Sequence, residues 1–241
     1  MILLSRKKSN ALLKILLARA SPRCNIPEVE DENSKLPCDK LLVQYFPEIP
    51  AYKVIRDYFL KSDYDYLVLA TDDIIVKPEH IERLKQSLEV SGVPVLSGYM
   101  NVDQHEWQNG NVNICYELAL KDKKLRYYNW IKNTEIPDKE FFQVKFAGFG
   151  LTAIRRDIVE KYEFAGDGIF KGKGMTFGAS LDFVFCWWCH ENQVPIWADS
   201  KIYMQHLRTS GTHRVGEKSR RVFIWRENGE AEKIDENWLS V

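Results

Sequence analysis

The segment 65-DYLVLA-70 constrains the fold most strongly, because it is an almost unbroken apolar run of strand length. Such runs are typical of strands buried on both faces, as in the centre of a parallel sheet. Around it the sequence predicts strands at 40–46 and 93–100, and helices from Pro50 to about Lys61 and from Pro78 to about Val90. This alternation predicts an α/β protein with a mostly parallel central sheet flanked by helices.

The remaining segments are less regular. Leucines at helical spacing predict a short amphipathic helix over 11–19, and the polar stretch 21–39 is expected to be a loop. Further elements are expected in this order: strands near 112–118, 124–130 and 143–154, a helix over 155–162, a loop at 165–179 with five glycines, a helix over 181–192, and strands at 195–207 and 221–225. We expect one domain over 1–241, with a weakly defined N-terminal part (1–39) and a C-terminal lid and tail (207–241).

Charge and cysteine content narrow the class of protein. Lys and Arg together number 34, as do Asp and Glu, so nothing in the net charge favours nucleic acid or an anionic membrane. Five scattered cysteines do not make a disulfide framework and favour a reducing compartment. The N-terminus imitates a signal peptide, but Lys14 and Arg19 interrupt its apolar region. We therefore predict a cytoplasmic protein with at most peripheral membrane contact.

The best single candidate for chemistry is the acidic pair after the buried strand. Asp72 and Asp73 follow 67-LVLA-70, and ligands of α/β sheets bind beyond the carboxyl ends of strands. Paired carboxylates favour a hard divalent cation such as Mg²⁺ or Mn²⁺. His206 follows another predicted strand and precedes a basic stretch, so it could serve a metal while the stretch binds phosphate. The plainer alternative is a turn aspartate ahead of Pro78 and a structural histidine.

Two further candidates lie between these sites. Gly148 and Gly150 lead into a strand and a helix, and they would let a substrate approach the backbone closely. Asp182 is expected in the first turn of the next helix, where it could take a proton from a substrate. The plainer alternatives are a strand–turn–helix packing unit and an ordinary first-turn acid.

The motif 186-CWWCH-190 matches the c-type haem attachment pattern C-x-x-C-H. Haem attachment would need export and a distal ligand, and zinc would need a remote fourth ligand such as Cys115. We interpret the motif as part of a buried helix in which the cysteines act as small hydrophobic side chains. The surrounding tryptophans and tyrosines fit either an aromatic core or a cleft that stacks flat ligands.

The order of these motifs resembles that of the GT-A glycosyltransferases, especially the inverting glycosyltransferase family 2. The segment 66-YLVLATDDIIVKPEHI-81 is similar to the family's strand with an Asp-x-Asp motif, and 148-GFGLTAIRRDIVEKY-162 is similar to its glycine-containing strand and Arg-Arg helix start. The x-Asp motif that opens an aromatic helix is matched at Asp182, and the late histidine at His206. In this register Thr71 stands where the family has its first aspartate. The usual first strand and base pocket are not evident, although 1-MILL-4 and the acidic 29-VEDENS-34 are candidate remnants.

The resemblance implies a metal-dependent transfer of a sugar from a nucleotide-sugar donor, such as a UDP- or GDP-sugar, to a hydroxyl of a glycan, lipid or protein. It implies Asp182 as the catalytic base of an inverting reaction, although a retaining enzyme has the same fold. The implied roles of the other residues are metal binding (Asp73, Asp72, His206), donor binding (Thr71, Asp72, Arg56, Arg208, Arg214) and the acceptor side (Gly148, Phe149, Gly150, Trp187). Two alternatives stay open: a degenerate or nucleotidyltransferase-like GT-A protein that binds nucleotide sugars without transfer, and a redox protein built on 186–190.

Overall fold

The computed structural model describes residues 12–21, 27–102, 110–121, 124–164, 181–207, 221–228 and 230–233. Several predictions fall outside these residues: Arg208 and Arg214, the glycine-rich loop at 165–179, the candidate strand at 1–4, and most of the expected lid.

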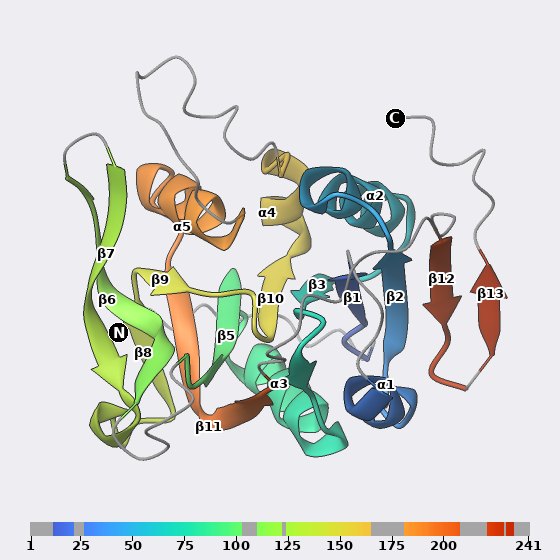
Figure 1. Ribbon diagram of the computed structural model, residues 1–241, viewed down its shortest axis with the longest axis horizontal. Helices are drawn as coiled ribbons and strands as arrows, with labels where there is room; N and C mark the ends of the chain where they lie inside the picture. The colour runs from blue at the N-terminus through green and yellow to red at the C-terminus, as the bar shows by residue number, and fades with distance from the viewer. Residues whose placement is uncertain are drawn as a thin grey trace.

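A ten-stranded sheet forms the centre of the molecule, in the order β13-β12-β2-β1-β3-β10-β5-β11-β4, with β8 also paired to β11 (Figure 1). Parallel pairing joins β1 to β2 and β3, and β11 to β5, while β10 runs antiparallel between β3 and β5. The strands of this sheet are β1 (Ile15–Ser21), β2 (Asp39–Gln44), β3 (Tyr66–Leu69), β4 (Ile74–Ile75), β5 (Val95–Met100), β8 (Phe141–Val144), β10 (Thr152–Arg155), β11 (Ile196–His206), β12 (Arg221–Trp225) and β13 (Ala231–Lys233).

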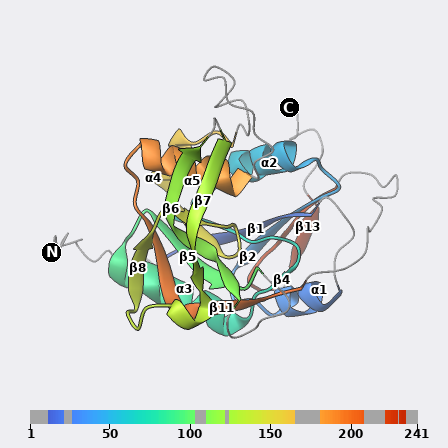
Figure 2. The same ribbon diagram turned by 60° about the vertical axis from the view of Figure 1, so that its left-hand side comes forward.

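Helices cover both faces of this sheet (Figure 1). One face carries α2 (Glu48–Lys61), α4 (Arg156–Lys161) and α5 (Leu181–Glu191), and the other carries α1 (Pro27–Ser34) and α3 (Pro78–Ser91). Two separate clusters of buried apolar side chains fill the two interfaces. A smaller sheet of β6 (Asn111–Lys121), β7 (Lys124–Lys132) and β9 (Phe146–Ala147) lies beside α5, as the turned view in Figure 2 shows. The predicted α/β class, with a large central sheet flanked by helices, is therefore confirmed.

The N-terminal part differs from the prediction. Residues Ile15–Ser21 form the central strand β1 rather than a helix, and the expected loop contains the helix α1. Residues 15–18 are all at most 3% exposed, because β1 is covered on both faces and paired on both edges. A short run of leucines that is buried on every side carries no strand periodicity, so the helical spacing was misleading. The acidic segment 29–34, a candidate remnant of the base pocket, lies in the helix α1.

The single strand predicted over 143–154 is also wrong. It is broken into β8, β9 and β10, and a tight turn at 148–151 separates the last two. In this turn the Gly150 N–H donates to the Gly148 carbonyl oxygen at 2.6 Å. This turn takes the chain from β9 in the small sheet to β10 in the large sheet.

A buried ion pair anchors α3 to β11. Asp199 is fully buried in β11, and its Oδ2 accepts hydrogen bonds from Arg83 Nε at 2.9 Å and Ser87 Oγ at 2.6 Å. In the described part of the chain, none of the helices has the length and apolar character needed to cross a bilayer.

Candidate functional site

Asp73 and His206 lie next to each other at one edge of the sheet. Asp73 follows β3, His206 ends β11, and the short β4–β11 pairing aligns His206 with Ile74. His206 Nε2 is 3.2 Å from Asp73 Oδ2, and its Nδ1 is 3.3 Å from the Asn101 carbonyl oxygen. The Thr71 hydroxyl donates to Asp73 Oδ1 at 2.8 Å. Backbone pairing and side-chain hydrogen bonds thus fix both groups, which are 133 residues apart in sequence.

Asp72 has a different environment from Asp73. Its Oδ2 accepts a hydrogen bond from Ser21 Oγ at 3.2 Å, and the residue is buried. The buried guanidinium of Arg19 lies near both aspartates and donates to the carbonyl oxygen of Ile74 at 3.0 Å. The structure therefore separates the two neighbouring aspartates: Asp73 pairs with the histidine, and Asp72 bonds to the end of β1.

Within the described ranges, no group of three or more His, Cys, Asp or Glu side chains is arranged to hold a metal ion. The Asp73–His206 pair offers one carboxylate and one imidazole. The carboxylate suits a divalent ion such as Mg²⁺ or Mn²⁺ that takes its other ligands from water and phosphate oxygens, whereas imidazole is a more usual ligand of zinc, copper, iron and nickel.

The turn at Gly148 and Gly150 lies between this pair and Asp182. A side chain built at Gly148 would place its Cβ 3.3 Å from Asp182 Oδ2 and 3.3 Å from Asn113 Nδ2. A Cβ at Gly150 would lie 3.1 Å from Asn113 Nδ2, 3.4 Å from Met204 Cε and 3.6 Å from Ile74 Cδ1. Ile74 is adjacent to Asp73, and Met204 is two residues before His206 in β11. The turn is therefore next to Asp182 at Gly148 and next to neighbours of the Asp73–His206 pair at Gly150.

Asn113, on β6, forms hydrogen bonds with this turn and with the end of β5. It is 3% exposed, its Oδ1 accepts the Met100 N–H at 2.8 Å, and its carbonyl oxygen accepts the Gly148 N–H at 2.9 Å. The backbone and side chain of Asn113 together therefore fix the position of the turn relative to the end of β5.

Asp182 lies in the first turn of α5, as predicted, and its Oδ1 accepts the Phe183 N–H at 2.8 Å. Glu48, in the first turn of α2, accepts a hydrogen bond from the Leu181 N–H and lies near Asp182. Loss of water around its carboxyl and the charge of Asp182 together raise the pKa of Glu48. The N-termini of α2 and α5 thus bring two carboxylates together beside the glycine turn.

Three residues expected at the site are used elsewhere. Arg56 Nε donates to the carbonyl oxygens of Val159 (3.1 Å) and Tyr162 (2.9 Å), so it caps the C-terminus of α4, two turns of α2 away from Glu48. The ring of Phe149 is 4% exposed and packs in an aromatic cluster with Tyr52 and Phe185. Trp187 is 9% exposed and also belongs to this core. Neither ring is placed to stack on a substrate.

The cysteines of 186-CWWCH-190 are core residues, as the sequence interpretation had it. Cys186 and Cys189 are at most 1% exposed, and burial raises the pKa of both thiols. Cys186 Sγ donates to the Ala147 carbonyl oxygen at 3.4 Å, while His190 lies on the exposed side of the helix. Within the described part of the chain, these side chains do not form a group that could hold a metal ion.

Sequence reasoning missed Glu48, Asn113 and Arg19. The helix α2 begins two residues before the predicted start at Pro50, which hid Glu48 in an expected loop. Asn113 interrupts the apolar strand 112-VNIC-115, and a polar residue inside such a strand was an available sign. Arg19 was counted as an interruption of an apolar N-terminus rather than as a buried side chain of β1.

No protein-family model and no curated protein matches the sequence. The chain is similar in structure to A197 from STIV, with a TM-score of 0.50, 14% identity, and coverage of 92% of this chain and 95% of that one. It also superposes on CMP:2-keto-3-deoxy-manno-octonic acid synthetase complexed with CTP, with a TM-score of 0.44, 10% identity, and coverage of 84% and 93%. The first likeness shows a shared fold, and the second is too weak to support a conclusion.

Proposed function

We propose that the chain is a GT-A-type glycosyltransferase that moves a sugar from a nucleotide-sugar donor to an acceptor hydroxyl, with inversion. One observation carries the proposal: a single glycine turn lies against Asp182 at Gly148 and against Ile74 and Met204, which are close in sequence to Asp73 and His206, at Gly150. The order of motifs along the sequence supports it independently, because it resembles that of family 2 enzymes.

The donor would lie against the Asp73–His206 pair with its diphosphate. A bound Mn²⁺ or Mg²⁺ would neutralise charge on the departing nucleoside diphosphate. Thr71 holds Asp73 Oδ1 through its hydroxyl, and the Asn101 carbonyl oxygen orients the imidazole of His206. A cation shared by Asp73 Oδ2 and His206 Nε2 would replace the hydrogen bond that joins these atoms at 3.2 Å. Arg208 and Arg214 would add positive charge at the phosphates.

The acceptor hydroxyl would lie near Asp182, across the turn of Gly148 and Gly150. The absence of side chains at Gly148 and Gly150 lets a sugar ring approach the backbone there. Asp182 would take the proton of the hydroxyl as its oxygen attacks the anomeric carbon from the face opposite the leaving group. One base and no covalent intermediate give inversion. Glu48 would keep the N-terminus of α5 in place through its bond to the Leu181 N–H.

The experiment that tests this proposal measures donor binding and donor turnover separately. Thermal stability is recorded with UDP, GDP, CMP and dTDP, each with and without Mn²⁺, because a ligand of the folded state raises stability by mass action. Release of nucleoside diphosphate from the matching UDP- or GDP-sugar then reports slow turnover to water. We expect one diphosphate to stabilise the protein only with Mn²⁺.

Three variants assign the roles. Asp182→Asn should lower turnover by about 100-fold or more while donor binding stays intact, in line with the usual contribution of a general base. Asp73→Asn should abolish the Mn²⁺-dependent stabilisation. Asp57→Asn, on an exposed part of α2, is the matched control and should change neither. Full turnover in Asp182→Asn, or stabilisation by none of the nucleotides, would refute the proposal; Mn²⁺-dependent binding without turnover would favour a binding protein of the same fold.

A further inference from the structure

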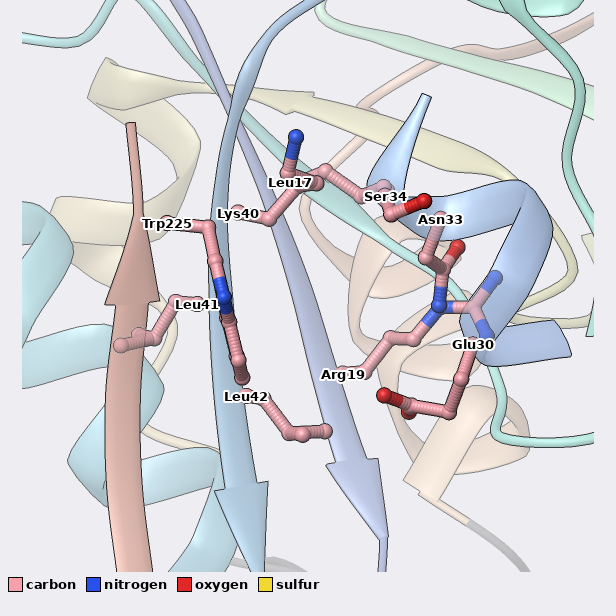
Figure 3. Close-up of a pocket in the computed structure, with 9 residues that line it drawn as sticks. All are labelled: Leu17, Arg19, Glu30, Asn33, Ser34, Lys40, Leu41, Leu42 and Trp225. Atoms are coloured by element: carbon pink, nitrogen blue, oxygen red, sulfur yellow. The ribbon is translucent and has the colours of Figure 1, made fainter. Parts of the chain in front are cut away.

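We propose that a cavity beneath α1 binds a small, flat, neutral ring that has a cyclic-amide edge, meaning a carbonyl oxygen next to a ring N–H. The cavity has a volume of about 110 Å³ and lies between α1 and the strands β1 and β2 (Figure 3). It is on the α1 face of the sheet, whereas Asp182 lies on the α5 face; of its lining residues, Arg19 also lies near Asp72 and Asp73. The inference does not rest on the proposed function.

Arg19 supplies unused hydrogen-bond donors to this cavity. The residue is 4% exposed, and its Nη2 donates to the Ile74 carbonyl oxygen at 3.0 Å. Its Nε and Nη1 are buried and have no hydrogen-bond partner. Buried donors without partners are rare because burial removes their bonds to water. In Figure 3 the guanidinium of Arg19 reaches from β1 toward α1.

Asn33 supplies an unused acceptor in the same place. Its Oδ1 is buried and has no hydrogen-bond partner, and Figure 3 shows its side chain beside the guanidinium of Arg19. The other polar groups lining the cavity already have partners: Lys40 Nζ donates to the Leu36 carbonyl oxygen at 3.1 Å, and Ser34 Oγ to that of Asp31 at 2.7 Å. Nε–H and Nη1 lie on opposite sides of the planar guanidinium, so one of them can serve a given carbonyl oxygen. One free donor of Arg19 and the free Oδ1 of Asn33 are together the complement of a C=O beside an N–H.

The charges around Arg19 favour a neutral ligand over an anion. Burial lowers the pKa of Arg19 to about 10, and the negative charges of Glu30, Asp72 and Asp73 oppose this effect. The guanidinium is therefore still charged at neutral pH, and three acids already balance it. An added anion would meet their repulsion, whereas a carbonyl oxygen would accept a hydrogen bond from one free N–H group of Arg19 without adding charge.

The remaining walls suit a flat apolar ring. Leu17 and Leu42 line the cavity floor, and the half-buried indole of Trp225, on β12, lines its side. Apolar walls with a few converging polar groups are the usual form of a small-molecule site. The volume would otherwise hold about three or four waters, at roughly 30 Å³ each. Water is therefore the competing occupant.

Uracil is the simplest probe, because it carries the C=O and N–H edge on one small ring. Its binding to the purified full chain is measured by isothermal titration calorimetry, beside 1,3-dimethyluracil, which keeps the carbonyls but has no N–H. We expect uracil to bind at least 10-fold more tightly than the dimethyl compound. A crystal soaked with uracil should place the ring between Trp225 and Arg19.

Variants locate the site. Arg19→Met and Asn33→Leu should each weaken uracil binding at least 10-fold, and Lys35→Met, which removes a cation from the outer side of α1, should leave it unchanged. If Arg19→Met does not fold, the uracil affinities of Asn33→Leu and Arg19→Lys test the inference instead, because both substitutions keep most of the packing. UDP tested on the same variants distinguishes a free ring from the base of a larger ligand.

Two results would overturn the inference. Equal affinity for uracil and 1,3-dimethyluracil would show that the cavity takes apolar rings without reading an amide edge. Failure of both compounds to bind, with ordered water at Arg19 and Asn33 in a crystal structure, would show that water completes these hydrogen bonds.

Discussion

Replacing Gly148 with alanine tests how tightly the glycine turn and Asp182 are coupled. The new methyl group would lie 3.3 Å from both Asp182 Oδ2 and Asn113 Nδ2, so one of them must move by a few tenths of an ångström. Asn113 is held by hydrogen bonds on both sides, which leaves Asp182 as the group that yields. If a misplacement of about 1 Å costs roughly 100-fold in rate, a shift of this size costs roughly 3- to 10-fold.

The assay compares donor turnover, donor affinity and thermal stability of Gly148→Ala with those of the wild type. We expect turnover to fall by this factor while the Mn²⁺-dependent stabilisation by the donor nucleotide is unchanged, because the Asp73–His206 pair is not displaced. The loss of unfolding free energy should stay within about 1–3 kcal/mol, the range for one extra methyl in a packed site. Unchanged turnover in a folded Gly148→Ala protein would refute the placement of Asp182 at the reacting centre.

Three further predictions concern stability, protonation and thiol reactivity. Arg83→Met leaves Asp199 buried without its cation, so urea unfolding should show a loss of about 3–5 kcal/mol, and a loss below 1 kcal/mol would contradict a structural role for the pair. Glu48 holds its proton more tightly in the folded state, so its contribution to stability is present at low pH and is lost as pH rises through its raised pKa. Asp182→Asn removes a nearby negative charge and should lower the pKa of Glu48. The pKa is followed by the ¹³C chemical shift of the Glu48 carboxyl carbon. The buried thiol of Cys189 should be alkylated by iodoacetamide only at the rate of unfolding, and fast labelling by mass spectrometry would exclude its place in the core.

The regular part of the fold could be predicted because its patterns are local. The run 67–70 is buried on both faces in β3, and Pro78 opens α3 where its fixed φ suits the first helical turn. The N-terminal strand could not be predicted, because Leu16 and Leu17 are buried by partners on both edges and faces that only the folded sheet supplies.

The sequence predicts that the site contains acidic residues and a histidine, but it does not predict which other residues belong to the site. Asp73, His206 and Asp182 were singled out because they end strands or begin a helix; the structure brings Asp73 and His206 together and puts Asp182 beside Gly148. Arg56 could not be assigned correctly, since its partners are backbone carbonyl oxygens more than a hundred residues away. The contribution of Glu48 likewise depends on its contact with Leu181, which no spacing in the sequence encodes.

The sequence separation between Asp73 and His206 has a consequence for protein synthesis. The two residues are 133 positions apart, so at ~5–20 residues per second the ribosome needs roughly 7 to 27 s to supply the second after the first. During this interval β5, a strand buried along its whole length, lacks β11 and presents an open apolar edge. The nascent chain should therefore depend on chaperones until β11 has emerged, and truncation before Ile196 should yield an insoluble product rather than a partly active one.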